Sequence, residues 1–377
     1  AALAAYMAAV DVQGAIAALR EPSGAEGLRR AYLEGLAECL GVMWDLGQEI
    51  LGQGQAVPYE RCVRASTGAP PQASTPVARR LRLADLLARA GHPSEGQGAS
   101  LLAAADRWRA ERLVPGKAIR ALSGAFIAEF DALAQRHLAP YLPQALRTVP
   151  RANIRFLPIK DAWFSGSMNY LGRERTPDGR PRYEATYEIN ASLQISVPEF
   201  QQLVSHEVVP GHVTTFAFLQ DLYQRRQVGF EATVLTMNTR AAALFEGLAN
   251  NAILIAHGVT DLDQLPDEDL QIGVLLALLQ DDAKNQSSYL TWMEGWAQPD
   301  VARVLRAEYL VSEERAQKLS GAWGRHPLLG RMYLPCYRAG TEKIAALRSL
   351  HGPEQILPAL YGCRGLVDVV TLDRALG

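Results

Sequence analysis

Three things are scarce in this chain of 377 residues: cysteine, basic clusters and long apolar runs. Its cysteines lack C-x-x-C spacing, which indicates free thiols in a reducing compartment, and we expect a cytoplasmic location. The formal net charge is −2 with no extended basic stretch, so neither nucleic acid nor a membrane surface is expected as a partner. No apolar run reaches the roughly 18 residues that a membrane-spanning helix needs. The four cysteines are Cys39, Cys62, Cys336 and Cys363.

The composition instead indicates a soluble globular protein. Hydrophobic residues make up 48% of the chain and charged residues 21%, which suits one large or two ordinary domains with a sizeable core. The Ala-rich start lacks the basic n-region of a signal peptide. We therefore predict a helix over residues 1–20, with Asp11 and Gln13 on its polar side.

Apolar spacing predicts helices along most of the chain. Only residues 151–159 and 182–195 are rich in β-branched and aromatic residues, which favours strands. Between them lies a Gly-rich, aromatic stretch, 161–181, with a Pro-Asp-Gly turn. We expect an N-terminal helical region (1–146), serving as lid or scaffold, and a catalytic region (147–377) continuous with it. The predicted helices cover 1–20, 25–52, 59–64, 77–91, 100–113, 116–146, 198–224, 230–257, 271–284 and 325–350.

The segment Leu203 to His212, LVSHEVVPGH, holds two histidines and a glutamate within seven residues. Two imidazoles can bind a zinc-type ion, and a neighbouring carboxylate can take a proton from its water. Metallopeptidase helices normally space the histidines four apart, whereas His206 and His212 are six apart, or roughly 600° around a helix. They converge only if the helix breaks at Pro210-Gly211. The alternative is a helix that ends at Val209 and carries surface histidines.

Glu246 stands in the otherwise apolar run ALFEGLANNAILIA (243–256). A buried carboxylate is costly unless it is paired or binds a metal. Glu246 is therefore either the third ligand of a two-His, one-Glu site or the partner of an arginine such as Arg240. Farther on, Tyr333 and Tyr337 lie one helical turn apart, and a tyrosine hydroxyl can support an oxyanion.

Five short elements together resemble the DUF885 family, whose members are mostly helical bacterial proteins related to zinc metallopeptidases. The family elements are Tyr-Leu-Gly, an Ile-Asn strand end, His-Glu-x-x-Pro-Gly-His, Glu-Gly-x-Ala and Tyr-x-x-Gly. In this chain they are Tyr170-Leu171-Gly172, Tyr187-Glu188-Ile189-Asn190, His206 to His212, Glu246 to Ala249, and Tyr337-Arg338-Ala339-Gly340. The similarity extends from Trp163 to Ala252 and is loose in the N-terminal third.

The resemblance implies a mainly α, zincin-related fold with a small β element beside the active-site helix. It implies His206, His212 and Glu246 as zinc ligands, Glu207 as general base and Tyr337 as oxyanion support. The substrate-binding candidates are Tyr170, Tyr187, Asn190 and Arg338. Two departures, Val213-Thr214-Thr215 after the histidines and Asn250-Asn251 after the glutamate, bear on the substrate and on peptidase activity.

The predicted function is zinc-dependent hydrolysis of a peptide or amide bond in a peptide or small-molecule substrate. Two alternatives stay open. One is a metalloenzyme of a small-molecule pathway that catalyses a different reaction. The other is a helical binding protein with a vestigial site. The sequence leaves the oligomeric state undetermined.

Overall fold

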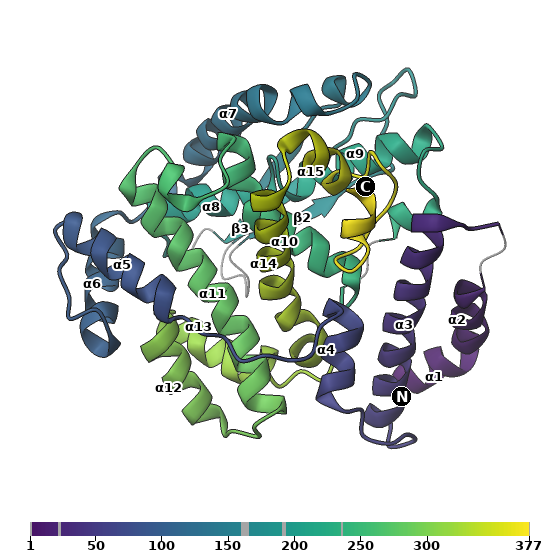
Figure 1. Cartoon of the computed structure of the whole chain (residues 1–377), viewed down its shortest axis with the longest axis horizontal. Coiled ribbons are helices and arrows are strands. Elements are labelled where there is room, and N and C mark those ends of the chain that lie inside the picture. Colours follow the sequence, from purple (N-terminus) through teal and green to yellow (C-terminus); the bar gives the residue numbers. More distant parts are fainter. Residues whose placement is uncertain (1, 22–23, 160–165, 191–193, 235–236, 377) are drawn as a thin grey trace.

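The computed structural model is mainly α-helical with one small sheet, which confirms the predicted fold class at that level (Figure 1). It describes residues 2–21, 24–159, 166–190, 194–234 and 237–376. Trp163, where the similarity to the family begins, therefore lies outside the described residues. The α-helices are α1 (Ala2–Ala9), α2 (Val12–Arg20), α3 (Gly27–Ile50), α4 (Tyr59–Thr67), α5 (Val77–Arg89), α6 (Gly98–Glu111), α7 (Ile119–His137), α8 (Val197–Glu207), α9 (His212–Gln224), α10 (Arg240–His257), α11 (Glu268–Trp292), α12 (Gln298–Tyr309), α13 (Glu313–Lys318), α14 (Leu334–Leu350) and α15 (Pro353–Leu360).

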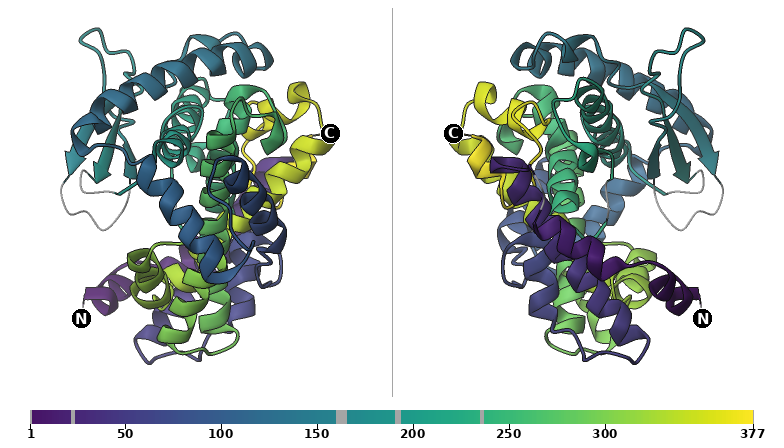
Figure 2. Two further views of the ribbon diagram at one scale, coloured as in Figure 1. Left: turned by 90° about the vertical axis from the view of Figure 1, so that its left-hand side faces the viewer. Right: turned by 90° about the vertical axis from the view of Figure 1, so that its right-hand side faces the viewer.

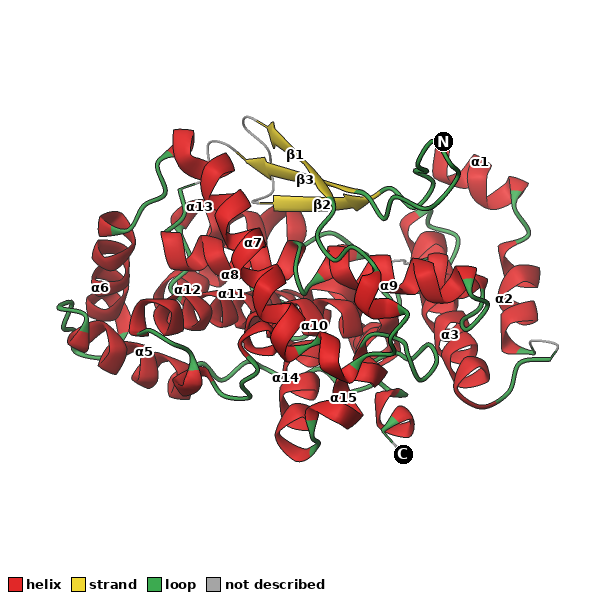
Figure 3. Ribbon diagram, turned by 90° about the horizontal axis from the view of Figure 1, so that it is seen from above, coloured by secondary structure: helices red, strands yellow, loops and turns green. Residues whose placement is uncertain are grey.

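The sheet has three strands in the order β1-β3-β2, namely β1 (Ile154–Ile159), β2 (Gly166–Tyr170) and β3 (Ala185–Asn190). β3 pairs parallel with β1 and antiparallel with β2. Figure 3 shows the sheet along one side of the helical body, with β2 nearest to the helices. In Figure 2 the sheet lies towards one end of the molecule, and α12 and α13 lie towards the other.

One apolar core joins the N-terminal helices to the rest of the chain, because its buried members run from Ala25 to Leu376. At its centre α10 and α14 approach very closely through two glycines. A Cβ on Gly247 would lie 2.2 Å from the carbonyl carbon of Gly340, and one on Gly340 would lie 1.8 Å from the Ala243 oxygen. The glycines of the Glu-Gly-x-Ala and Tyr-x-x-Gly elements therefore serve one purpose, which is to let these two helices touch backbone to backbone.

Several predicted boundaries are wrong, each for a local reason. Residues 1–20 form two helices, because the Asp11 side chain accepts a hydrogen bond from Gly14 N at 2.9 Å and caps α2. The helix predicted over 116–146 ends at His137, and short 3₁₀ turns containing or following Pro140 and Pro143 replace its last part. The helix predicted over 325–350 begins at Leu334, after a π-helical segment, Leu329–Tyr333.

The Gly-rich stretch contributes a strand that sequence reasoning missed. β2 occupies residues 166–170, and the predicted Pro-Asp-Gly turn follows, with Gly179 at a φ of 83°. The two predicted strands shorten to β1 and β3. β2 lacks the alternation of a half-buried strand, since its burial hardly varies from residue to residue.

The segment Arg240–Gln264, which includes α10, is long and apolar enough by composition to cross a membrane. However, 72% of its most apolar window is buried inside the structure. Here it is the central core helix, packed against α14, α7 and α8.

Candidate metal centre

The helix is interrupted between α8 and α9, at the place that the motif predicts. α8 ends at Glu207 and α9 begins at His212, and the Val209–Pro210 peptide bond between them is cis. A Cβ on Gly211 would lie 1.8 Å from the His206 oxygen, so only glycine fits here. The Thr215 hydroxyl donates to the Gly211 oxygen at 2.9 Å, which ties the break to the first turn of α9.

This break turns the two histidines toward each other, although six residues separate them. Their ring centroids lie 4.7 Å apart, with the ring planes nearly perpendicular. Glu246 of α10 completes a group whose ligand atoms all lie within 4.8 Å of one another. Its Oε2 is 3.4 Å from His206 Nε2 and 3.8 Å from His212 Nε2. His206, His212 and Glu246 can therefore hold a metal ion, as predicted.

The two carboxylate oxygens of Glu246 differ in their hydrogen bonds, and the one that faces both imidazoles, Oε2, has no donor among the described residues. Glu246 Oε2 is buried and has no hydrogen-bond partner among the described residues, whereas Oε1 accepts from the Tyr333 hydroxyl. A buried carboxylate oxygen without a donor is costly. Two imidazole nitrogens and this oxygen form a donor set typical of a catalytic zinc site, so the residues fit a metal ion.

Charges within the group shift its pKa values in opposite directions. Burial raises the pKa of Glu246, but the two imidazoles outweigh it and hold that pKa well below its ordinary value. Burial lowers the pKa of His206, but Glu246 and Glu207 outweigh it and raise that pKa above its ordinary value. Negative charge is therefore concentrated where a cation would sit.

The hydrogen bonds of Asn250 fix the tautomer of His206. The Asn250 amide nitrogen donates to Asp281 Oδ2 at 2.6 Å and to Thr341 Oγ1 at 2.8 Å. Thr341 is free to accept, because its own proton goes to the Tyr337 carbonyl. The Asn250 Oδ1 atom must then face His206 Nδ1, 2.8 Å away, and accept its proton. In the neutral ring this leaves the lone pair on Nε2, which points to Glu246.

Two tyrosines line the other side of Glu246. Tyr333 donates directly to Glu246 Oε1, and the Tyr337 hydroxyl donates to that of Tyr333 at 3.3 Å. Burial, helped by the charge of Glu246, raises the pKa of both tyrosines well above its ordinary value, so both keep their protons. Tyr333 is thus the tyrosine that touches a metal ligand, and Tyr337 lies one hydroxyl farther away.

Glu207 follows His206 directly and ends α8, half-buried. After burial, its charge is the cause that raises the pKa of the Tyr187 hydroxyl, and it also acts on Tyr337. The Glu207 charge is thus felt by a residue of β3 and by a residue of α14.

The four substrate-binding candidates lie in different settings. Tyr170 donates to Gln220 and packs on Phe216, which stacks on His212 with centroids 5.9 Å apart. Tyr187 is fully buried, so its surface is not available to a substrate. Asn190 is half-buried at the end of β3. Arg338 forms ion pairs with Asp282 at 3.3 Å and with Glu342 at 2.9 Å.

The alternative partner for Glu246 is not used, because the Arg240 guanidinium pairs with Glu38. Sequence reasoning missed Asp281 and Lys284, which are buried on α11 and joined at 2.9 Å. Like Glu246, they are charged residues next to an apolar run, here QIGVLLALLQ, and the residues that follow them on α11 are also buried. This pattern is the signal that could have identified them. Asn250 was noticed only as a departure from the family pattern.

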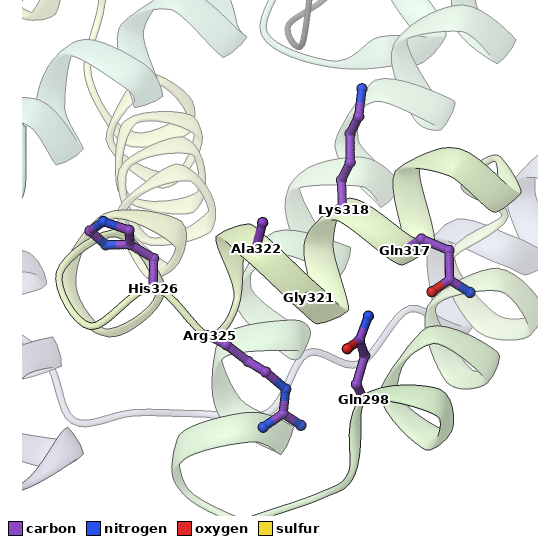
Figure 4. Close-up of a pocket in the computed structure, with 7 residues that line it drawn as sticks. All are labelled: Gln298, Gln317, Lys318, Gly321, Ala322, Arg325 and His326. Atoms are coloured by element: carbon purple, nitrogen blue, oxygen red, sulfur yellow. The ribbon is translucent and has the colours of Figure 1, made fainter.

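Two hollows on the surface contain none of the triad residues. One, of about 560 Å³, is lined by Gln298, Gln317, Lys318, Gly321, Ala322, Arg325 and His326. Figure 4 shows Lys318 and Arg325 pointing away from each other, so the polar groups do not converge on one ligand. The other, lined by Arg82, Asp85, Leu86, Arg89, Asp263, Glu268 and Gln271, is occupied largely by ion pairs such as Arg89 with Glu268. Neither adds to the chemistry of the triad.

The fold is similar to that of two bacterial proteins of known structure. One, from Colwellia psychrerythraea, is described as a "putative lipoprotein"; it matches with a TM-score of 0.63 at 14% identity, over 99% of this chain and 68% of that one. The other, from Shewanella oneidensis, is described as a "putative lipoprotein of unknown function"; it matches with a TM-score of 0.58 at 15% identity, over 96% of this chain and 69% of that one. No protein-family model matches the chain, and no curated protein matches it by sequence. At these identities the likeness establishes the fold alone.

Proposed function

We propose that this protein is a zinc-dependent hydrolase of peptide or amide bonds, built on a zincin-related fold of the DUF885 type. The observation that carries the proposal is the buried, unpartnered Glu246 Oε2 within reach of two imidazole nitrogens. His206 Nε2, His212 Nε2 and Glu246 Oε2 would hold the ion. When bound there, zinc supplies a Lewis acid and lowers the pKa of water.

In this proposal Glu207, which directly follows the ligand His206, acts as the general base. It accepts the proton of the attacking water and returns it to the leaving nitrogen. The Tyr337 hydroxyl can turn from its long contact with Tyr333 to a developing oxyanion, because that contact is a weak one at 3.3 Å. Tyr333 keeps Glu246 Oε1 engaged, which leaves Oε2 to face the ion.

The first test is metal content, measured by elemental mass spectrometry on tag-free protein. We expect about one zinc per chain in the wild type, and loss of zinc in His206→Ala and in Glu246→Ala. Wild type that takes up no zinc even after zinc is supplied would favour the vestigial binding protein.

The second test is hydrolysis of a panel of peptides, amides and carbonyl substrates. Glu207→Gln should retain zinc and lower kcat by about 10²- to 10⁴-fold, the usual contribution of a general base. Unchanged activity in Glu207→Gln would exclude this mechanism and favour a different metal-dependent reaction. The cytoplasmic location stays a prediction, since structural likeness at 14–15% identity does not bear on it. Cell fractionation would test it against the envelope location that the names of the two neighbours suggest.

A further inference from the structure

Arg315 of α13 is a half-buried arginine. Its guanidinium carbon lies over the ring of Trp323, 5.0 Å from the centroid. Its Nε is fully buried and has no hydrogen-bond partner in the part of the chain that the structure describes. Among the described residues, no carboxylate oxygen lies within 4.0 Å of the Arg315 guanidinium. The adjacent Glu314 forms its ion pair with Lys318 instead. The surroundings of Arg109 are different: it is similarly enclosed, but two of its nitrogens donate hydrogen bonds to Glu199.

A second cation lies close to Arg315. Lys284 stands over the ring of Tyr337, with its ammonium 3.2 Å from the centroid, and pairs with Asp281 at 2.9 Å. Arg315 acts electrostatically on Lys284, and the carboxylate of Asp281 acts on both cations. Glu314 also acts on Arg315, and Glu246 also acts on Lys284. Ala316 and Ala283, the chain neighbours of Arg315 and Lys284, pack in one apolar cluster, which sets α13 against α11. Asp281 forms an ion pair with Lys284, whereas Arg315 forms none with a described carboxylate.

Tyr337, whose ring lies beneath the Lys284 ammonium, connects this cluster to the candidate metal centre. Its hydroxyl contacts Tyr333, and Tyr333 contacts Glu246. Keeping a half-buried guanidinium without a partner costs free energy, and such a cost is characteristic of functional sites. A guanidinium presents a planar fork that fits a carboxylate, and an aromatic ring beneath it holds the plane in place.

We propose that Arg315 binds a carboxylate of the substrate, on the Tyr337 side of the metal centre. The inference rests on the proposed hydrolase function, and it deepens it by naming the class of substrate. The carboxylate is either the C-terminus of a peptide or an acidic side chain, since the same fork binds both. Arg315 is a binding residue in this scheme, and its charge recruits and orients the anionic end of the chain to be cleaved.

The test is equilibrium binding of matched peptides to the zinc-loaded protein by titration calorimetry. The probes are N-acetyl dipeptides with a free C-terminal carboxylate, the same dipeptides as carboxamides, and carboxamides with a glutamate side chain. We expect the wild type to bind at least one carboxylate form about tenfold or more tightly than the neutral amide. The probe that shows this preference identifies the source of the carboxylate.

Arg315→Met should abolish this preference, and Arg325→Met is the matched control. Arg325 lies in the hollow of Figure 4, where it donates to the Trp296 carbonyl, and its replacement should leave the preference intact. Arg315→Met should also keep its zinc and melt at or above the wild-type temperature, because it removes an unpaired charge. A structural arginine would behave in the opposite way, and its loss would lower the melting temperature.

Equal binding, or no binding, of carboxylate and amide forms to the wild type overturns the inference. So does a preference that survives in Arg315→Met, or a melting temperature that falls by several degrees in that variant. The hydrolase proposal fails separately, through absent zinc or full activity in Glu207→Gln. A carboxylate preference in a protein without zinc would thus leave Arg315 as an anion site and remove only the catalysis.

Discussion

Glu199 and Glu246 are both buried glutamates, on the neighbouring helices α8 and α10, but their surroundings differ. Glu199 accepts hydrogen bonds from two Arg109 nitrogens and from the Ser196 hydroxyl at the start of α8. Glu246 has a tyrosine on one oxygen and only imidazoles near the other. The first carboxylate is fully satisfied by the protein. The second has one oxygen without a hydrogen-bond donor, and this is the difference that we expect between a structural buried charge and one that binds a ligand.

The largest effect should come from breaking the structural pair. Glu199→Gln leaves the enclosed Arg109 guanidinium without its buried counter-charge, and only the more exposed Asp106 remains, 3.6 Å away. We expect the free energy of unfolding to fall by about 3–5 kcal/mol. Urea unfolding followed by circular dichroism measures this. Zinc content should stay at the wild-type level while the protein is folded. A fall in zinc affinity in the folded variant would mean that the two glutamates are not independent.

The opposite pattern should follow from changing Glu246. Glu246→Gln removes one ligand, and structural zinc sites bind with about 10–16 kcal/mol over four ligands, or roughly 2.5–4 kcal/mol for each. We therefore expect zinc affinity to fall by roughly 100- to 1,000-fold, measured by competition with a chromogenic chelator. Unfolding of the metal-free variant should change much less than in Glu199→Gln. Wild-type zinc affinity in this variant would show that Glu246 is not a ligand.

A smaller effect should come from Asn250, which touches no metal. Asn250→Leu removes the acceptor that holds the proton on His206 Nδ1, and we expect zinc affinity to fall by about 10- to 100-fold. Asn251→Leu is the control, because Asn251 is equally buried but bonds to the Gly247 and Thr341 carbonyls instead. Nitrogen-15 shifts of the His206 ring at alkaline pH report the tautomer directly. A neutral ring with its proton on Nε2 in the wild type would contradict the assignment.

The smallest effect should be the pH dependence of zinc binding. Protons and zinc compete for His206 Nε2, and the pKa of His206 is raised above its ordinary value of about 6.5. As the pH is lowered, zinc affinity should therefore begin to fall while the pH is still above 6.5, and it should decrease by about tenfold for each further unit by which the pH drops. Competition titrations between pH 8 and 6 measure the slope, and circular dichroism over the same range checks the fold. A flat profile would argue against His206 as a ligand.

Local sequence signals predicted much of the fold and the candidate site. The helical pattern is confirmed, and the Pro210-Gly211 break has its expected effect because both residue types interrupt a helix wherever they occur. Glu246 was recognisable because it is a charge in an apolar run. The strand β2 and the π-helical segment before α14 were not predicted, since neither has a periodic pattern of its own.

The sequence by itself determined which side chains can bind a metal and that the helix carrying two of them must break. Tertiary structure alone decided what surrounds them. The contact of Gly247 with Gly340 sets α14 against α10, and this puts Tyr333, rather than Tyr337, on Glu246. Packing of α11 places Asp281 behind Asn250, and it places Lys284 near Arg315. The physical reason is range: propensity and spacing act over a few residues, whereas these partners lie more than 25 residues apart and meet only because the helices pack.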